Sequence, residues 1–143
     1  MNPFEDAIID RMVAPAYSVA EEYANTVTHG VGLFFSVIAL LYIMTTLPTD
    51  YSALQKTGVV AYGISLVLMF LTSTLYHAST KPNAKGVLKR LDHCAIYLLI
   101  ASTYSPILTI SLDSPAANKL LVFIWSAAIA GAVFKAFFAG RFK

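Results

Sequence analysis

The sequence predicts an all-α membrane protein with four transmembrane helices, and three observations lead to this prediction. Hydrophobic residues make up 57% of the 143 residues, while charged residues make up only 13%, about half the share typical of a soluble domain. Helices of a soluble bundle would carry polar residues every three or four positions, and this pattern is missing. Instead, charged residues are absent from four long stretches, 23–49, 57–80, 93–112 and 120–134.

The first two stretches each predict one helix that crosses the membrane, which requires about 20 mainly apolar residues. We expect the first helix at about 27–47 and the second at about 57–77, with turn residues at 48–50 between them. The preceding segment, 1–26, is acidic and polar, and we expect it to be cytoplasmic. A secretory signal peptide would instead begin with basic residues before its apolar core. The first helix is therefore predicted to be an uncleaved anchor.

The remaining stretches predict a third helix at about 91–110 and a fourth at about 119–139. The fourth reaches the required length if Lys135 extends its ammonium group to the membrane interface. Together the helices form one membrane domain over residues 1–143. Small residues on the fourth helix form a face suited to close contact with another helix, namely Ala127, Ala128, Gly131 and Ala132.

The distribution of basic residues predicts the orientation, because short loops rich in Lys and Arg stay in the cytoplasm. The segment between the second and third helices contains Lys81, Lys85, Lys89 and Arg90. The end of the chain falls on the same side by alternation and contains Lys135, Arg141 and Lys143. The opposite loops have little net charge, with Lys56 and Lys119 offset by Asp50 and Asp113. We therefore expect the N-terminus and residue 143 to be cytoplasmic. No segment resembles a nucleic-acid-binding surface.

Polar residues that could carry chemistry are predicted to lie at one depth, near the cytoplasmic ends of the helices. His29 opens the first helix, His77 closes the second, and Asp92 and His93 open the third. Ser73 precedes His77 by four residues, so the two side chains share one helix face. Glu22 and His29 would also share a face if the first helix extended that far back. Ionisable residues inside membrane spans are costly and therefore suggest a function.

Metal binding is one chemistry that suits this group. Neutral histidine is a common ligand of zinc, and a catalytic zinc site has three protein ligands and one open position. Asp92 could orient a metal-bound water, and Ser73 could stabilise a developing oxyanion. Alternatively, the histidines are interfacial residues that bond to water or lipid headgroups. The spacing of the residues leaves both interpretations open.

Three motifs resemble those of the bacterial hemolysin III family. They are the runs EEYANTVTHGVG at 21–32, STLYH at 73–77 and LDHCAIY at 91–97, the last continued by ASTYSP at 101–106. The resemblance covers nearly the whole chain. This family is the bacterial branch of the progestin and adipoQ receptor group, which includes the adiponectin receptors and is related to alkaline ceramidases. The resemblance implies a seven-helix bundle in the bacterial inner (plasma) membrane with a cytoplasmic N-terminus.

The resemblance also implies a zinc ion near the inner face. Its ligands would be a histidine at the end of helix two, here His77, and two histidines of an H-x-x-x-H motif in helix seven. Ser73 and Asp92 match the serine and aspartate that accompany the metal. This chain has no H-x-x-x-H motif, so two of the three ligands are absent; His29 and His93 have the right depth to replace them. We therefore expect the N-terminal part of a seven-helix bundle, as a fragment or truncated product, rather than a short form that works as an oligomer.

Three functions remain as hypotheses, with a membrane lipid as the expected partner. The family name implies a pore-forming, cytolytic activity, although a pore should have polar residues through the whole depth of the bilayer. The kinship with ceramidases implies zinc-dependent hydrolysis of a lipid amide, for which this chain alone is expected to be inactive. The third hypothesis is a non-catalytic sensor or regulator of the membrane.

Overall fold

The computed structural model describes residues 17–138 of the chain, and the residues described form four long helices with no strand. Each of the four is long and apolar enough to cross a membrane. The predicted all-α membrane class with four spans is therefore confirmed. Along the chain the elements are α2 (Val19–Thr46), α3 (Ala53–Ala78), α4 (Pro82–Pro106), the π-helical turn η1 (Ile107–Ser111) and α5 (Pro115–Phe138).

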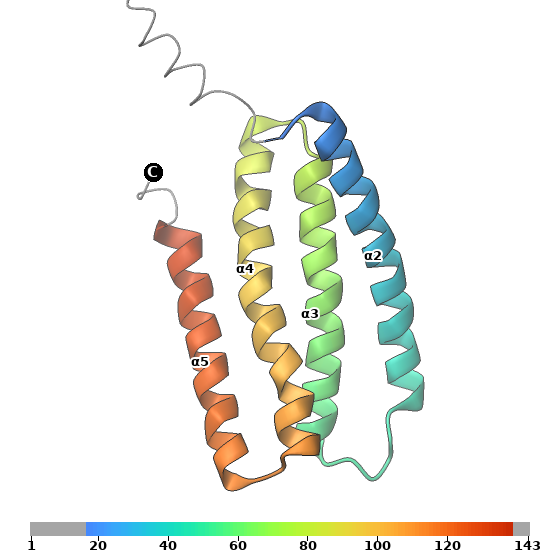
Figure 1. The fold of residues 1–143 in the computed structure, drawn as a ribbon, viewed down its shortest axis with the longest axis vertical. Coiled ribbons are helices and arrows are strands. Elements are labelled where there is room, and N and C mark those ends of the chain that lie inside the picture. The colour runs from blue at the N-terminus through green and yellow to red at the C-terminus, as the bar shows by residue number, and fades with distance from the viewer. Residues whose placement is uncertain (1–16, 139–143) are drawn as a thin grey trace, which may run out of the picture.

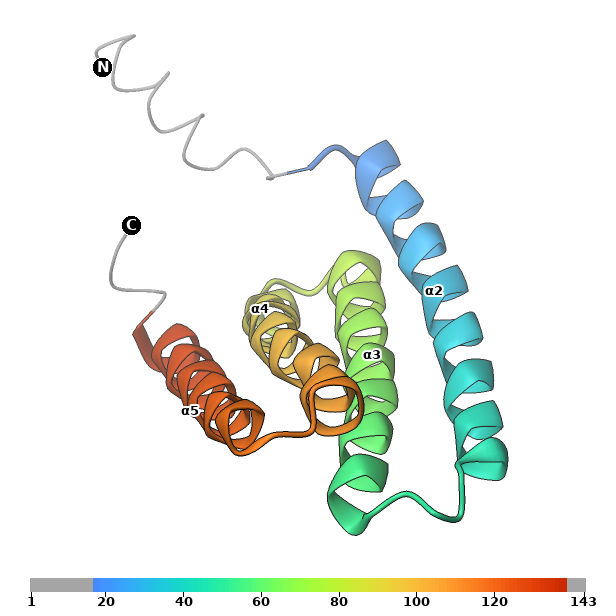
Figure 2. The same ribbon diagram turned by 60° about the horizontal axis from the view of Figure 1, so that its bottom comes forward.

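The helices form a row of antiparallel neighbours in chain order (Figures 1 and 2). Contacts join α2 to α3, α3 to α4 and α4 to α5, whereas within the described residues the backbone of α2 does not approach that of α4 or α5. The start of α2, the end of α3, the start of α4 and the end of α5 consequently meet at one end of the row, which we call the polar end. This arrangement brings the predicted polar residues toward one another.

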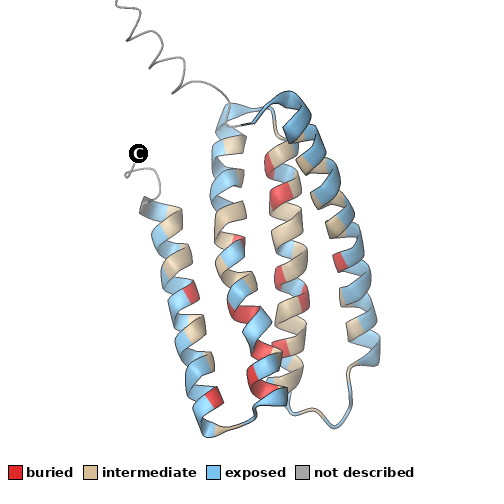
Figure 3. Cartoon of the chain, in the orientation of Figure 1, coloured by how far each residue is buried: buried red, intermediate tan, exposed pale blue. Residues whose placement is uncertain are grey.

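Burial is concentrated in the two middle helices, as Figure 3 shows. In the most apolar part of each span, 22% of residues are buried in α3 and 33% in α4 with η1, against 6% in each of α2 and α5. The outer helices therefore expose large apolar side chains, including Phe34, Phe35 and Phe123. Exposed apolar surface of this extent is unusual on a soluble monomer. It suits contact with lipid and agrees with an integral membrane protein.

Two helices begin about two turns before their expected starts. α2 starts at Val19 instead of about 27, because Ser18 and Glu21 form a capping box that satisfies backbone N–H groups at the helix start. α4 starts at Pro82 instead of about 91, and proline is favoured in the first turn since it has no N–H to leave unpaired. The basic segment is therefore largely helical. Residues 1–16, Arg141 and Lys143 lie outside the described residues.

α4 and α5 approach closely where α5 carries small residues. Gly131 faces the ring of Tyr97, and a Cβ atom added at Gly131 would lie only 2.6 Å from Tyr97 Cε1. One residue further, the thiol of Cys94 donates to the backbone oxygen of Ala132 at 3.4 Å. Ala128 is buried. The predicted contact face is therefore confirmed at these positions, whereas Ala127 is exposed.

Candidate functional site

Glu22 is the centre of a polar network of side chains at the polar end. One carboxylate oxygen of Glu22 lies 2.6 Å from Nδ1 of His77, and the other accepts a hydrogen bond from Nζ of Lys85. The side chains are partly shielded, with 17% of Glu22, 8% of His77 and 31% of Lys85 exposed. Hydrogen bonds to an ionised partner are among the stronger ones in proteins. Glu22 thus connects the first turn of α2 to the end of α3 and the start of α4.

Aromatic rings surround the imidazole of His77. The ring of His29 is stacked on it, with centroids 5.7 Å apart and planes within 2°. Tyr76 and Tyr17 contact it at centroid distances of 4.6 Å and 5.5 Å. The ammonium of Lys85 also lies 5.3 Å above the ring of Tyr76, within the range of a cation–π interaction. His77 is therefore held in one orientation from several sides.

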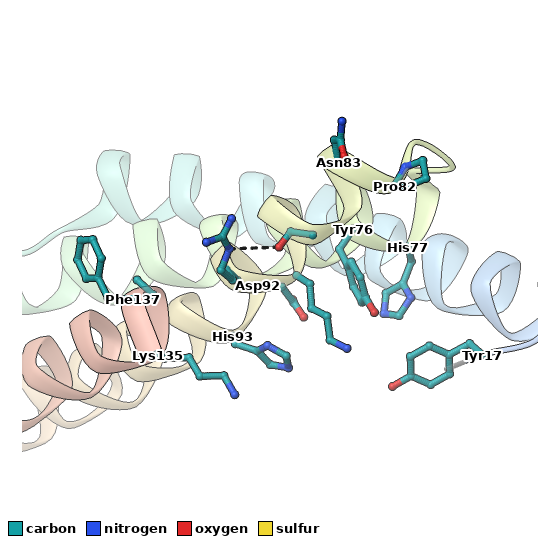
Figure 4. Close-up of a pocket in the computed structure, with 13 residues that line it drawn as sticks. Tyr17, Tyr76, His77, Pro82, Asn83, Asp92, His93, Lys135 and Phe137 are labelled. Atoms are coloured by element: carbon teal, nitrogen blue, oxygen red, sulfur yellow. Dashed lines mark hydrogen bonds between the residues drawn. The ribbon is translucent and has the colours of Figure 1, made fainter. Parts of the chain in front are cut away.

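A cavity of about 780 Å³ opens beside His77, between the start of α4 and the end of α5 (Figure 4). Asp92 and His93 project into it from α4, and Lys135 approaches from α5. Lys89 and Arg90 also line it. The cavity therefore combines imidazole, carboxylate, ammonium and guanidinium groups, while the aromatic rings of Tyr76 and Phe137 form part of its wall. Such a mixture is suited to a ligand with both polar and apolar parts.

The structure brings together most of the predicted site residues. His77, Asp92 and His93 line the same cavity, and His29 contacts this group through its stacking on His77. Ser73 lies one helical turn from His77 but is buried, with 4% exposed, and does not line the cavity. In this part of the chain Ser73 therefore packs between helices and is not exposed to a ligand in the cavity.

Comparison with known proteins identifies the family. The sequence model of the family described as "Haemolysin-III related" matches residues 17–142. The chain belongs to the hemolysin III family. It is 40% identical to a "Hemolysin-3 homolog" of Bacillus subtilis (strain 168) over 126 residues, which cover 88% of this chain and 59% of the relative. It is 41% identical to "Hemolysin-3" of Bacillus cereus over 133 residues, which cover 93% and 61%, respectively.

This hemolysin III chain therefore spans about three fifths of the length of the two curated relatives. No solved structure gives a significant match. The match to the family confirms the resemblance inferred from the three motifs, and the chain is a hemolysin III-like integral membrane protein.

The zinc site implied by the family resemblance needs three ligands that converge on one point. Among residues 17–138, no group of three His, Cys, Asp or Glu side chains could hold a metal ion. Nδ1 of His77 faces Glu22, while His93 lies with Asp92 and Lys135 around the cavity. His29 and His93 thus do not complete a ligand set with His77. By themselves the described residues do not fit a zinc ion.

Two important residues of this hemolysin III site were missed by the sequence reasoning. The sequence pattern indicates Lys85 only as a charge that sets the orientation, and Glu22 only as a neighbour of His29 on one helix face. The capping box at Ser18 and Glu21 could have indicated that α2 starts before Glu22. The helical start of α4 at Pro82 places Lys85 in its first turn, within reach of Glu22.

Proposed function

We propose that this chain binds the polar headgroup of a membrane lipid in the cavity at its polar end. The observation that supports this proposal best is the position of the cavity, at the end of helices whose middle parts expose large apolar side chains. Helix ends meet the headgroups of a bilayer, whereas the middle of each span meets acyl chains. A ligand that carries both a polar and an apolar part would therefore reach this cavity directly from the membrane.

The proposed location is the cytoplasmic face of the bacterial inner membrane. The segment that connects α3 to α4 carries Lys81, and the first turns of α4 carry Lys85, Lys89 and Arg90. Basic residues close to the ends of membrane spans are retained on the cytoplasmic side. Lys135, near the end of α5, belongs to the same side and lines the same cavity. The N-terminal segment would be cytoplasmic as well.

A cytolytic pore, which the names of the relatives suggest, is less well supported. The buried polar side chains of the described spans are serine and threonine hydroxyls. Several of them donate to backbone oxygens of their own helical segment, as Ser36, Ser102 and Thr109 do. A water-filled path would need polar groups that face a common channel over the full depth of the bilayer. In the described part, the charged groups gather at the two ends of the row instead.

A zinc-dependent hydrolase of a lipid amide is a second candidate, and one observation favours it. The carboxylate of Glu22 on Nδ1 of His77 favours the tautomer that leaves Nε2 as an acceptor, as is typical of metal-binding histidines. Asp92 lines the adjacent cavity. The described residues supply only His77 of the implied ligand set, so this candidate depends on ligands outside them.

Lipid binding can be tested by filling the cavity. Gly86 lines it, and no atom lies within 4 Å of a Cβ added there, so Gly86→Phe should occupy space without a clash. Ala84→Phe is the matched control, because Ala84 is exposed in the same turn and does not line the cavity. Native mass spectrometry of the chain in detergent would compare retention of phosphatidylglycerol, phosphatidylethanolamine and diacylglycerol.

We expect the wild-type chain and Ala84→Phe to retain lipids that carry a headgroup in preference to diacylglycerol. Gly86→Phe should lose most of this retention. Equal retention of all three lipids by all three proteins would contradict the proposal. Release of a dye from vesicles containing the chain would support the pore instead.

A further inference from the structure

A second cavity lies between the same two helices as the polar one. It has a volume of about 530 Å³ and is an apolar groove between α4 and α5. Side chains that line it include Tyr97, Ile100 and Tyr104 from α4, and Leu120, Ile124 and Ala128 from α5. Its lining in the described part of the chain includes no charged residue, so it suits a hydrocarbon chain.

Residue spacing aligns the groove with the polar cavity. On α4, His93 of the polar cavity and Tyr97 and Ile100 of the groove follow one another at intervals of four and three residues. On α5, Lys135 and Ala128 are two helical turns apart. Residues at these intervals share one face of a helix. The two cavities therefore follow a single seam between α4 and α5, which runs from the polar end toward the middle of the membrane.

The charges in the polar cavity favour an anion. Lys89, Arg90 and Lys135 line it, and Asp92 is the one lining carboxylate among residues 17–138. His93 is close enough to Lys89, Lys135 and Asp92 to interact with them electrostatically. Within residues 17–138, the ion pairs formed by Lys and Arg do not include Lys89, Arg90 or Lys135. The three lining cations therefore exceed the one lining carboxylate by two charges. Arg and Lys are the usual partners of phosphate.

We propose that this seam binds an anionic phospholipid, with its phosphate near Lys89, Arg90 and Lys135 and one acyl chain in the apolar groove. The inference rests on the proposed binding of a lipid headgroup and adds the chemical class of the lipid. The distances agree with it. Ala128 lies about 10 Å from Lys135 along α5, at 1.5 Å per residue. That depth is within the inner leaflet, because half of the hydrocarbon core is about 15 Å thick.

The phosphate contact is tested by removing one cation at a time. Lys135→Gln and Lys89→Gln remove charges that line the cavity. Lys119→Gln is the matched control, because Lys119 is exposed near the opposite end of α5. Binding of phosphatidylglycerol to the chain in a neutral detergent at low salt would be measured for each variant. A basic residue near an anionic lipid contributes about 1 kcal/mol, so each cavity variant should bind about fivefold more weakly, with Lys119→Gln unchanged.

The acyl-chain contact is tested on α5. Ala127 is exposed and lines the groove, so Ala127→Phe should fill it and remove most of the phosphatidylglycerol binding. Ala130→Phe is the control, because Ala130 is exposed on the same helix but does not line the groove. Helix content measured by circular dichroism would verify that every variant is folded.

Inorganic phosphate separates a lipid site from a simple anion site. We expect phosphate at equal concentration to leave phosphatidylglycerol bound, since it cannot occupy the groove. Displacement of the lipid by phosphate, together with unchanged binding in Ala127→Phe, would replace the lipid with a free anion and overturn the inference. Binding that is the same in Lys135→Gln and Lys119→Gln would also overturn it while leaving headgroup binding intact. Failure of all the lipids to bind would instead overturn the proposed function itself.

Discussion

Glu22 holds an unusual position for a carboxylate in a membrane protein, because it serves two partners from different helices. Its oxygens contact His77 on α3 and Lys85 on α4, and the contacts lie at the polar end of the row. A carboxylate that is shielded from water needs such partners, since burying an unpaired charge is costly. The same contacts fix the ring of His77 beside the cavity.

Loss of the Glu22 carboxylate should destabilise the chain. Glu22→Gln keeps the size of the side chain but removes the charge that binds His77 and Lys85. We expect the free energy of unfolding in detergent to fall by about 1.5–3 kcal/mol, the range for hydrogen bonds to charged groups. Asp113→Asn is the control, because Asp113 is exposed in the loop before α5. Equal stability of the two variants would show that the Glu22 contacts contribute little.

His77 and Asp92 should act as one unit if they serve the same ligand. Both line the polar cavity, His77 from the end of α3 and Asp92 from about three turns inside α4. A double-mutant cycle with His77→Ala and Asp92→Asn, in a relative of full length, would measure lipid binding, zinc affinity or lipid-amide turnover. We expect the double variant to match the weaker single variant, as for residues that act together.

The contrary result of this cycle is also informative. Effects that add within about 0.5 kcal/mol would indicate two independent residues at helix ends. A cycle with His77→Ala and the exposed Asp113→Asn provides the reference for additivity, because Asp113 lies in the loop before α5 and does not line the cavity.

At the scale of elements, the contact between α4 and α5 depends on the absence of a side chain at Gly131. Any Cβ atom there would overlap the ring of Tyr97. Gly131→Leu should therefore push the helices apart and lower the free energy of unfolding by about 1–3 kcal/mol, the usual cost of overpacking. Ala130→Leu, on the exposed side of α5, should have a smaller effect in the same unfolding assay. If Ala130→Leu were equally destabilising, the contact with Tyr97 would not be responsible.

The number and class of the helices could be predicted from the sequence because apolar length decides whether a segment crosses a membrane. The residues at which the helices begin could not be predicted in this way, since apolar length measures only the part of a helix within the hydrocarbon core of the membrane. The true start of α2 depends on the cap at Ser18, and that of α4 on Pro82. The first turns of α2 and α4 contain Glu22 and Lys85, so the ion pairs of Glu22 could not be predicted from the apolar stretches.

The depth of the candidate site was easier to predict than its contacts. Antiparallel helices place His77 and Asp92 toward the same end of the row, and both line one cavity. However, α4 begins at Pro82, so Asp92 lies about three turns inside α4 and not at its opening as expected. Which side chain faces a cavity depends on helix rotation and packing. Ser73, which shares a helix face with His77 by spacing, is buried between helices instead. Lys135 lines the cavity because α5 packs against α4.

At the scale of the whole molecule, the positions of the possible metal ligands in residues 17–138 predict how tightly the chain binds zinc. These residues offer no group of three possible metal ligands. The purified 143-residue chain should therefore bind zinc weakly or not at all, because structural zinc sites rest on about 10–16 kcal/mol from a full ligand set. Metal analysis after dialysis against a chelator would measure this, beside a relative of full length as the reference. Stoichiometric zinc in the chain would point to His29 and His93 as additional ligands, and substituting each in turn would identify them.

The orientation of the whole row follows from where its basic residues lie. Lys81, Lys85, Lys89 and Arg90 all fall between the apolar parts of α3 and α4, and Lys135 lies at the same end of the row. Reporter proteins fused after Arg90 and after Lys143 should both behave as cytoplasmic, because short basic loops resist translocation. A fusion after Asp113, in the loop before α5, should behave as periplasmic and serves as the control.

Removing the positive charges supplies the second half of this experiment. Replacing Lys81, Lys85, Lys89 and Arg90 with glutamine should weaken the orientation and give mixed reporter signals at both ends, since acidic residues contribute little to it. Periplasmic activity of the fusion after Arg90 in the unmodified chain would reverse the orientation. It would also place the polar cavity at the outer leaflet, so the proposed lipid would have to come from that leaflet.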